Sequence, residues 1–446
     1  MSRDPQGNMR ARTGFANGAL AHALASISLV AMLVAACGGS SAGQTPSATA
    51  SSAATPASTP TAAAQSAAPT GSGTSTASPN PTAATSPQAS PSALARKSWQ
   101  TGLRVVATSP VAPGVGWVLA QTGLYETNDD GATWATVTPV GLKIAYTVKN
   151  ASLAYSNVVG LAASGGQHAY IATSSAKGKM VTITVWRTAN GGAGWKSAAA
   201  PAVAVPVLPD GIGTAYPPVT FDIVDAQHAF FSFYESAGMD TFEDWVFETT
   251  DGGASWKLLP YTIPAETVGL PPGVGVYFQS PLAGVFEFGR VAMSTATGWG
   301  NWHKTVFTAG SGTWQNQPVT LLAANNWAIV GPSDGTSIDY ATSSNQGATW
   351  SLHSRKLPGV AGAYDSTTAV LGPSLWVVAI LTSTSRETYL TSNAGTTWTK
   401  VGSQPDPATQ KAAVFLDKNH AWSSPQMSGQ LYVTENGGAA WKLVTP

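Results

Sequence analysis

An eight-residue pattern recurs through the chain after residue 97, and it is the feature that most constrains the fold. Each copy begins with Ser or Thr, has Asp or Asn in third place and Gly in fifth, and ends in Trp. The copies are TNDDGATW (127–134), TANGGAGW (188–195), TTDGGASW (249–256), SSNQGATW (343–350), TSNAGTTW (391–398) and TENGGAAW (434–441). We call this pattern the box. Repetition of one pattern along a chain is typical of repeated supersecondary units.

A seventh, degenerate box is expected at TAGSGTW (308–314), where Gly310 replaces the acid or amide. An aromatic segment with strand character precedes every box: GVGWVLA (114–120), QHAYIA (167–172), QHAFFSF (227–233), AGVFEF (283–288), NNWAIVG (325–331), LWVVAI (375–380) and NHAWSS (419–424). One further strand leads into each box and another leaves it, which makes four short strands per repeat. Residues 98–446 are therefore predicted to form an all-β fold, a seven-bladed β-propeller with four-stranded antiparallel blades.

Each box is expected to form the hairpin between the third and fourth strands of its blade. Asp or Asn accepts hydrogen bonds from turn amides, Gly supplies a positive φ, and Trp buries its indole beneath the turn. Calcium binding by Asp129 or Asp251 is the alternative, but the other four boxes carry Asn in place of the acid. The residues expected to be structural are Asp129, Gly131, Trp134, Asn190, Gly192, Trp195, Asp251, Gly253, Trp256, Asn345, Gly347, Trp350, Asn393, Gly395, Trp398, Asn436, Gly438 and Trp441.

The box resembles the Asp-box, or BNR repeat, of the sialidase-like β-propeller superfamily. Together with the His-Ala-aromatic strands, it also resembles the photosystem II assembly-factor propellers and their bacterial relatives. This resemblance spans residues 98–446 and lies in the scaffold motif, so it implies a fold and does not imply a photosynthetic role.

The N-terminus has the features of an export signal. Three arginines within the first twelve residues precede an apolar stretch at 19–37, which is short for a membrane span. Either Met1 or Met9 can be the start. The stretch ends in LVAAC and resembles a bacterial lipobox, which implies cleavage after residue 36 and lipidation of Cys37. An ordinary signal peptide with an incidental cysteine is the alternative.

Residues 38–95 contain no charged residue and consist almost entirely of Ser, Thr, Ala, Pro, Gly and Gln. Such a segment buries too little apolar surface to fold and is predicted to be a disordered linker. The predicted organisation is a signal peptide (1–36), a lipidated tether (37–97) and a propeller (98–446). The protein is then extracytoplasmic and contacts the cell membrane through its lipid anchor alone.

Composition excludes several classes of function. The chain has 22 basic and 22 acidic residues, and only 10% of its residues are charged, which argues against nucleic-acid binding. Cys37 is the only cysteine, so neither a disulfide framework nor a thiolate metal site is expected. His168, His228 and His420 recur at equivalent positions before a strand, which indicates a role in a turn or in packing and not metal ligation. No metal or cofactor is expected, and the protein is expected to be a monomer.

Binding residues are expected on the face of the ring opposite the boxes, because loops on a rigid scaffold carry function. The links YESAGMDTFEDW in blade 3 and GRVAMSTATGWGNWHK in blade 4 are the most elaborate. The four acids of the blade 3 link have an alternative interpretation as a solvated insertion. The two tryptophans of the blade 4 link have an alternative interpretation as cover for a hydrophobic blade edge. The candidates are Glu235, Asp240, Glu243, Asp244, Arg290, Trp299, Trp302 and His303.

A sialidase needs three arginines on the substrate carboxylate and a tyrosine nucleophile with a glutamate partner. The Phe-Arg-Ile-Pro signature of that family is absent, and the predicted propeller has five arginines: Arg104, Arg187, Arg290, Arg355 and Arg386. We therefore assign no catalytic residue. The expected function is non-catalytic recognition or assembly of envelope components, with an envelope protein or glycan as partner. The alternative is a carbohydrate-active propeller, either a sialidase-like glycoside hydrolase or a glycan-binding module.

Overall fold

The structure is a computed structural model that describes residues 2–3, 9–10, 94–144, 146–149, 153–205, 219–238, 241–260, 275–288, 291–307, 319–323, 325–332, 336–360, 365–382, 385–405, 413–424 and 429–444. The predicted lipobox with Cys37, and the tether up to residue 93, lie outside these residues. β1 (Ser2–Arg3) pairs with β2 (Met9–Arg10). The described residues contain no helix that is long and apolar enough to cross a membrane.

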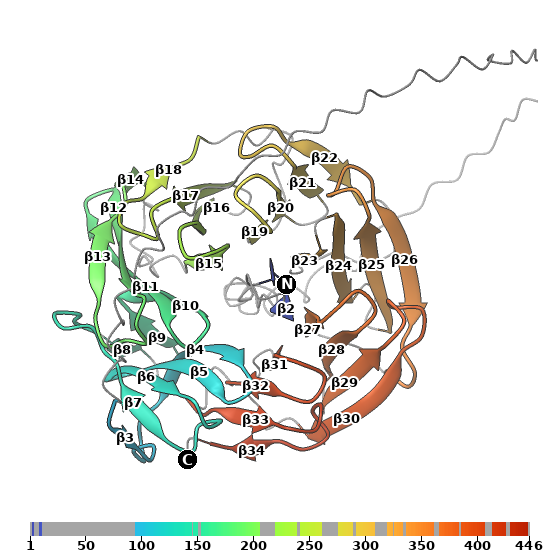
Figure 1. Cartoon of the computed structure of the whole chain (residues 1–446), viewed down its shortest axis with the longest axis horizontal. Coiled ribbons are helices and arrows are strands. Elements are labelled where there is room, and N and C mark those ends of the chain that lie inside the picture. Colours follow the sequence, from blue (N-terminus) through green and yellow to red (C-terminus); the bar gives the residue numbers. More distant parts are fainter. Residues whose placement is uncertain are drawn as a thin grey trace, which may run out of the picture. The chain divides into compact units, whose positions relative to one another are not determined.

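Seven antiparallel sheets form a ring, which confirms the predicted seven-bladed propeller (Figure 1). Each blade uses four consecutive strands, which run from the inside of the ring to its rim. Blade 1 contains β4 (Val105–Ala112), β5 (Val115–Ala120), β6 (Gly123–Thr127) and β7 (Trp134–Thr136); blade 2 contains β10 (Val158–Ser164), β11 (His168–Lys177), β12 (Met180–Thr188) and β13 (Lys196–Ala199). Blade 3 contains β15 (Thr220–Ile223), β16 (Ala229–Gly238), β17 (Thr241–Thr249) and β18 (Lys257–Leu258); blade 4 contains β19 (Gly275–Phe278), β20 (Gly284–Phe288), β21 (Val291–Thr295) and β22 (His303–Val306).

The remaining blades repeat this order. Blade 5 contains β23 (Val319–Ala323), β24 (Asn326–Pro332), β25 (Ser337–Ser343) and β26 (Ser351–Lys356); blade 6 contains β27 (Asp365–Val370), β28 (Trp376–Leu381), β29 (Ser385–Thr391) and β30 (Thr399–Pro405); blade 7 contains β31 (Ala413–Phe415), β32 (Ala421–Ser423), β33 (Tyr432–Thr434) and β34 (Lys442–Leu443). Two blades gain a fifth strand: β3 (Arg96–Lys97) pairs with β7, and β14 (Val203–Ala204) pairs with β12. A separate hairpin joins β8 (Tyr146–Lys149) to β9 (Leu153–Ser156).

The six complete boxes form one hydrogen-bonded turn. The hydroxyl of the first residue donates to Oδ1 of the Asp or Asn (2.8–3.0 Å) and accepts from the amide of the fifth-position Gly (2.7–3.1 Å). The same Oδ1 accepts from the seventh amide at 2.8–2.9 Å. Asp and Asn therefore serve equally, because each supplies the acceptor that the turn requires.

Each box also ties its blade to the rest of the ring. The fourth residue has a positive φ, and its amide donates to a carbonyl in the turn between the first two strands of the same blade, as Ala394 does to Ser374 at 3.0 Å. The fifth-position Gly lies against the preceding blade, as Gly395 lies against Tyr340 and Gly438 against Thr388. A box is thus both a turn and an inter-blade contact.

The prediction of a seventh box at 308–314 was wrong. The third strand of blade 4 is β21, and the turn that follows it is TATGWGNW (295–302), whereas residues 308–314 lie outside the described residues. Thr295 and Trp302 hold the first and eighth positions, but Thr297 replaces the acid or amide and Trp299 replaces the glycine. Gly298 preserves one contact, since its amide donates to the Leu282 carbonyl at 2.7 Å.

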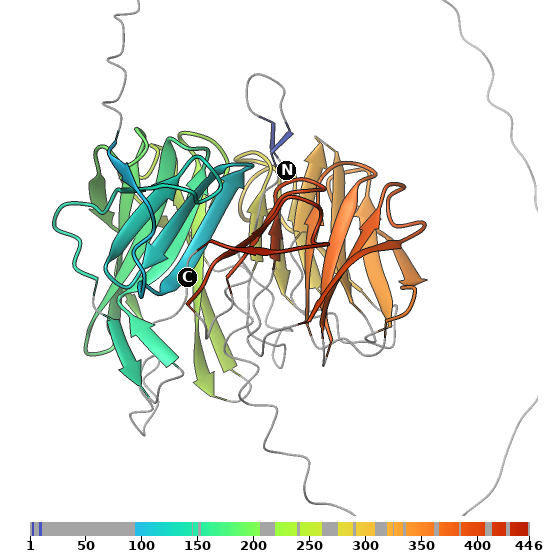
Figure 2. The ribbon, with the colours of Figure 1, turned by 90° about the horizontal axis from the view of Figure 1, so that it is seen from below.

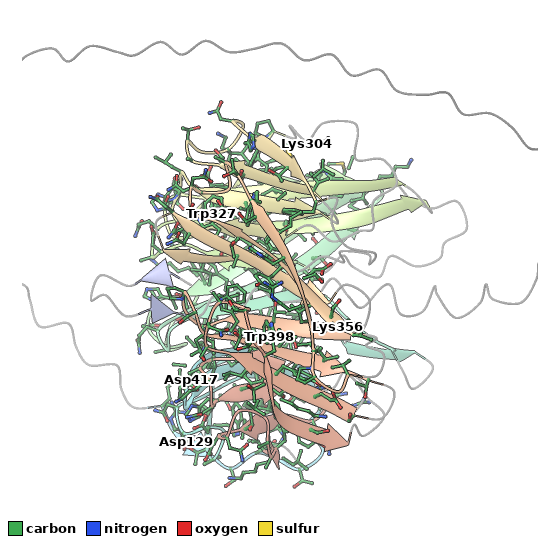
Figure 3. The ribbon with its side chains drawn as sticks, turned by 90° about the vertical axis from the view of Figure 1, so that its right-hand side faces the viewer. Asp129, Lys304, Trp327, Lys356, Trp398 and Asp417 are labelled. Atoms are coloured by element: carbon green, nitrogen blue, oxygen red, sulfur yellow. The ribbon has the colours of Figure 1, made fainter. Side chains whose placement is uncertain are left out.

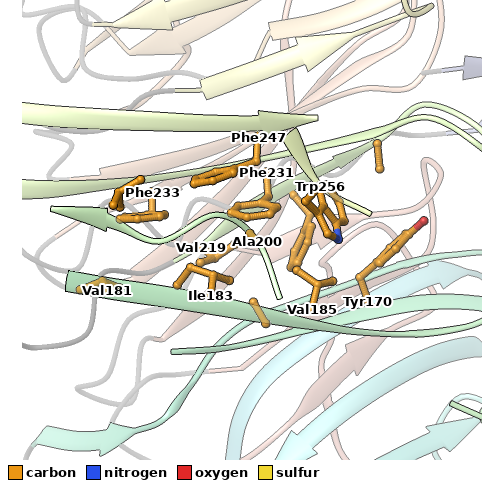
Figure 4. Close-up of a cluster of buried hydrophobic side chains, with 14 of the residues drawn as sticks. Tyr170, Val181, Ile183, Val185, Ala200, Val219, Phe231, Phe233, Phe247 and Trp256 are labelled. Carbon is orange, nitrogen blue, oxygen red and sulfur yellow. The ribbon is translucent and has the colours of Figure 1, made fainter. Parts of the chain in front are cut away.

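Apolar side chains fill the spaces between adjacent blades. Between blades 2 and 3, the Tyr170 ring of blade 2 stacks on Phe221 of blade 3 at 5.8 Å between centroids and meets Trp256 of blade 3 edge-on at 6.1 Å (Figure 4). Such aromatic pairs add about 0.5–1.5 kcal/mol beyond their area burial. The blades are therefore held apart at fixed distances by close-packed rings.

The ring closes where blade 7 meets blade 1. All described strands of blade 1 precede those of blade 2 in the chain, and all strands of blade 7 come last, so no strand of the described residues is exchanged between the termini. Trp134 meets Trp422 edge-on at 6.3 Å, and the Val105 amide donates to the Gly429 carbonyl at 2.6 Å. Trp99 packs into the same cluster. We call this contact the seam.

Acid should weaken the box turns that carry aspartate. The Ser255 hydroxyl and amide, which donate to the Asp251 carboxylate, lower the pKa of that group from 3.8 to about 2. A carboxyl group whose pKa is lower in the folded than in the unfolded chain stabilises the fold at pH values above its unfolded pKa. This contribution is lost as the pH falls from about 4 towards 2. Asp251→Asn should therefore make stability less dependent on pH in this window, measured by urea unfolding at a series of pH values.

The natural asparagine boxes show that this substitution preserves the turn. Asn345 and Asn393 donate through Nδ2 to Thr349 and Thr397 at 2.9 Å, at the position where Asp251 accepts from Ser255. An unchanged pH dependence in Asp251→Asn would mean that other carboxylates set the acid limit. A large loss of stability at neutral pH would mean that the charge itself is needed.

Candidate functional site

Two neighbouring hairpins extend well beyond the others, and we call them the paired hairpins (168–188 and 229–249). In each blade, one residue of the second strand lies opposite the first residue of the box. Past that residue, the second strand continues for eight residues in blade 2 and for nine in blade 3. It continues for four or five residues in blades 1, 4, 5 and 6. At about 3.3 Å per residue, the paired hairpins are longer by roughly 10–17 Å. Figure 2 shows them projecting from one face of the ring.

A shared core makes the paired hairpins one rigid body. Val181 and Ile183 of the blade 2 hairpin pack in the same cluster as Phe233 of the blade 3 hairpin, and all three are buried (Figure 4). Val203 of β14 and the partly buried Trp245 belong to this cluster too. The apolar packing thus joins the bases of the two hairpins and, through Val181 and Val203, continues into the extended part of the blade 2 hairpin.

The tips of the paired hairpins differ in charge. In blade 2, Lys177 and Lys179 are exposed, and Met180 keeps 42% of its surface accessible. In blade 3, the strand register sets Glu235 opposite Glu243, with Asp244 next along β17. Asp240 lies outside the described residues. The blade 2 hairpin thus has an exposed basic tip, and the blade 3 hairpin carries acidic residues in its sequence.

The predicted binding residues do not lie together. Glu235, Glu243 and Asp244 belong to the blade 3 hairpin, on the expected face. Trp299 and Trp302 lie in the box-position turn of blade 4, which is on the opposite face, and His303 begins β22 beside them. The reason is that VAMST forms the third strand rather than part of a link. Arg290 lies outside the described residues.

The two tryptophans cover a blade edge, which was the structural alternative. Trp299 stacks on Phe278 with centroids 6.5 Å apart, meets Trp302 edge-on at 4.9 Å, and donates through Nε1 to the Pro260 carbonyl of blade 3 at 2.9 Å. Where other blades place a glycine against their neighbour, blade 4 places an indole.

Trp299→Ala should lower the free energy of unfolding by about 2 kcal/mol, because a half-buried indole and its hydrogen bond are lost. Chemical denaturation measures this directly. Leu282→Ala is the matched control: this neighbouring side chain is 58% exposed, and its removal should change stability by no more than about 0.5 kcal/mol. Equal effects of the two substitutions would contradict the bridging role of Trp299.

Basic residues line the rim. The outermost strand of every blade carries one lysine, and none of these seven strands carries an acid: the residues are Lys97, Lys196, Lys257, Lys304, Lys356, Lys400 and Lys442. Figure 3 shows Lys356 on the outer strand of blade 5, with Asp129 and Asp417 together on the box face. Lysines on an exposed strand discourage pairing with other edges. In blades 2, 3 and 7 this lysine directly follows the box Trp in the sequence.

The described acids and bases with shifted pKa are bound into structural contacts. In blade 6, Glu387 accepts from the Tyr389 hydroxyl and from Lys400, both at 2.6 Å. Tyr389 is fully buried, and burial followed by the Glu387 contact raises the pKa of its hydroxyl. This tyrosine–glutamate pair therefore cannot reach a substrate.

Two arginines of the described residues, Arg386 and Arg187, join blades. Arg386 donates to the Ser423 hydroxyl of blade 7 at 2.8 Å and lies 5.9 Å from the Trp441 ring. Arg187 donates to the Gly252 carbonyl of the blade 3 box at 2.6 Å. Guanidinium groups that bond to backbone and hydroxyl partners in different blades do not form a binding site for a substrate carboxylate.

Two of the three recurring histidines belong to turns, and the third, His168, begins β11. His228 Nδ1 lies 2.9 Å from Asp225, and His420 Nδ1 lies 2.8 Å from Asp417. Each aspartate also accepts two backbone amides of its own turn. In the part of the chain that the structure describes, no group of three His, Cys, Asp or Glu side chains could hold a metal ion.

No family model and no curated protein matches this chain. Among solved structures, it is similar to YCF48 from Cyanidioschyzon merolae, with 16% identity, a TM-score of 0.43, and coverage of 77% of this chain and 97% of that one. A YCF48 bound to a D1 peptide has 17% identity, a TM-score of 0.41, and coverage of 79% and 95%. An ancestral GH74 enzyme has 14% identity, a TM-score of 0.46, and coverage of 78% and 48%. Similarity at this level concerns the arrangement of strands and not the ligand.

Proposed function

We propose that this chain is a surface-tethered lipoprotein whose propeller is a non-catalytic recognition or assembly scaffold for envelope components. The observation that carries the proposal is the rigid projection of the paired hairpins, roughly 10–17 Å beyond the hairpins of blades 1, 4, 5 and 6. A regular ring needs no such extension to fold, and the extended part of the blade 2 hairpin is packed through Val181 and Val203, so it offers a preformed surface at little entropic cost.

The chemistry of the described residues supports recognition over catalysis. Glu387, Tyr389 and Arg386 are all buried within or between blades. The box acids serve as turn acceptors, in the manner of Asp-boxes, and their hydrogen bonds are made within the turn. A glycosidase needs two carboxyl groups, or a tyrosine and an acid, facing one substrate.

The anchor and tether form the second part of the proposal. Lipidation of Cys37 would hold the chain at the outer side of the cell membrane, and a flexible coil of 58 residues (38–95) spans roughly 40–45 Å root-mean-square. Cys37→Ser should move the protein from the membrane fraction into the medium. Retention of the variant in the membrane fraction would contradict lipid anchoring.

Site-specific crosslinking tests the recognition surface. A photoreactive residue is placed at Ser175 or Lys177, both exposed on the blade 2 hairpin, and at Ala254, exposed in the blade 3 box, as the matched control. The full chain is then irradiated in intact cells. The proposal expects the same protein adduct from positions 175 and 177, and none from 254.

The other outcomes are equally informative. An adduct that forms only from position 254 would place recognition on the box face and overturn the site. A glycan adduct without a protein, or sugar released from envelope material by the purified chain, would favour the carbohydrate-active alternative.

A further inference from the structure

The outer edge of β17 differs from the rim edges described above. Each outermost strand carries a lysine and no acid, whereas the stretch Thr241–Trp245 of β17 reads TFEDW, with two acids and no basic residue. Lysine protects a strand edge against pairing. This stretch lacks that protection and has the opposite charge.

Blade 2 shows how such an edge is closed. β12 is covered along its outer side by β13, which reaches Thr184, and by β14, which pairs at Met180 and Val181. In blade 3, β18 pairs only with Phe247 and Glu248, and the Leu259 amide donates to the Val246 carbonyl at 2.8 Å. Within the described residues, no strand pairs with the outer side of Thr241–Trp245.

The register fixes which backbone groups face outward there. Because Val246 bonds outward to Leu259, the alternation of an antiparallel strand directs the amides and carbonyls of Phe242 and Asp244 outward too. These groups lie on the blade 3 hairpin, whose second strand is longer than that of blade 4, which ends at Phe288.

We propose that the outer edge of β17 from Thr241 to Trp245 binds an extended, basic segment of a partner protein, which adds to the blade as a further β-strand. Main-chain hydrogen bonds supply the affinity in this mode, and side chains at alternate positions supply the specificity. Glu243 and Asp244 occupy opposite faces of the strand, so a segment with lysine or arginine on either face is complementary. This inference rests on the proposed recognition surface and names its partner chemistry.

The test uses the full chain and a fluorescent nine-residue peptide of alternating lysine and threonine. Anisotropy should show saturable binding, and hydrogen exchange of the segment 241–245 should slow when the peptide is bound. A peptide of the same sequence with N-methylated central amides keeps the charge but cannot donate, and it should not bind. An alternating glutamate–threonine peptide should not bind either.

Asp244→Lys reverses one charge on the edge and should weaken binding about tenfold, since an attractive pair becomes a repulsive one. Glu435→Lys is the matched control, because it makes the same change at an exposed position in the blade 7 box, and it should leave binding unchanged. Melting curves check that both variants fold. The N-methylated peptide tests the same edge without altering the protein.

Three results would overturn the inference. Equal binding of the N-methylated peptide would show a charge effect without strand addition. Slow exchange at 241–245 in the free, monomeric chain would show that another part of the chain already covers the edge. Slow exchange that appears only with self-association would assign the edge to a second copy. If peptide binding fails while positions 175 and 177 still crosslink one protein, the inference falls and the proposed function stands.

Discussion

Gly395→Ala should lower the free energy of unfolding by about 2–5 kcal/mol. Gly395 has a φ of 81°, which costs an alanine roughly 1–2 kcal/mol. An added Cβ would also lie within 3 Å of the Tyr340 ring of blade 5 and of the Trp376 ring, and overpacking of this kind costs about 1–3 kcal/mol. The two penalties add because one is local to the backbone and the other arises between blades.

The neighbouring residue supplies a control of opposite sign. Ala394 also has a positive φ, at 54°, so Ala394→Gly should raise stability by up to about 1 kcal/mol. Urea or guanidinium unfolding measures both variants on the same turn. If both substitutions destabilise by similar amounts, the turn is sensitive to any change and the conformational argument fails.

Trp422→Ala should cost about 3–5 kcal/mol and should loosen the seam. Trp422 is 1% exposed and packs with Trp134 across the junction of blades 7 and 1. Removing a buried tryptophan leaves a cavity that the surroundings fill only in part. Because no strand crosses the seam, the loss of this side chain weakens the closure of the ring directly.

Trp117→Ala is the matched control for the seam. Trp117 holds the corresponding position in blade 1, is fully buried, and packs between blades 1 and 2, which the chain connects covalently. Equilibrium unfolding should show that Trp117→Ala and Trp422→Ala lower the free energy of unfolding by similar amounts. Exchange of the Val105 amide, which bonds to Gly429 across the seam, should accelerate far more in Trp422→Ala. Equal acceleration in both variants would mean that the seam is no weaker than other blade junctions.

The number and type of blades could be predicted from the sequence because six boxes report the same turn. Each second strand begins within its predicted aromatic segment, for example β11 (His168–Lys177) in 167–172 and β28 (Trp376–Leu381) in 375–380. The box residues encode their hydrogen bonds locally, so short-range pattern is enough. The contact of the fifth-position Gly with the preceding blade was not predicted, because it depends on how blades pack.

Blade 4 shows why the box pattern fails to identify a turn that other contacts hold in place. TATGWGNW has neither the acid nor the glycine, and its Trp299 reaches Pro260 instead. A search for the box therefore favoured the similar but displaced TAGSGTW. The error moved Trp299 and Trp302 to the wrong face, since one strand more or less reverses the side on which a loop emerges.

The site was predicted only in part for the same reason. The acids of the blade 3 link were noted, but the blade 2 hairpin was not, because its sequence SSAKGKMVT has no unusual chemistry. Its importance comes from length and from Val181 and Ile183, which pack against the other hairpin. Length beyond the ring becomes visible only when the strands are registered against one another.

The seam has a consequence for how such a chain can change. Since every blade is built from consecutive residues, the ring is a cyclic series that happens to be cut between blades 7 and 1. Joining the two ends and opening the chain between blades 4 and 5 should give a circular permutant with the same blades in the same order. Gains or losses of a whole blade need only a change in one link, whereas a strand exchanged at closure would forbid both.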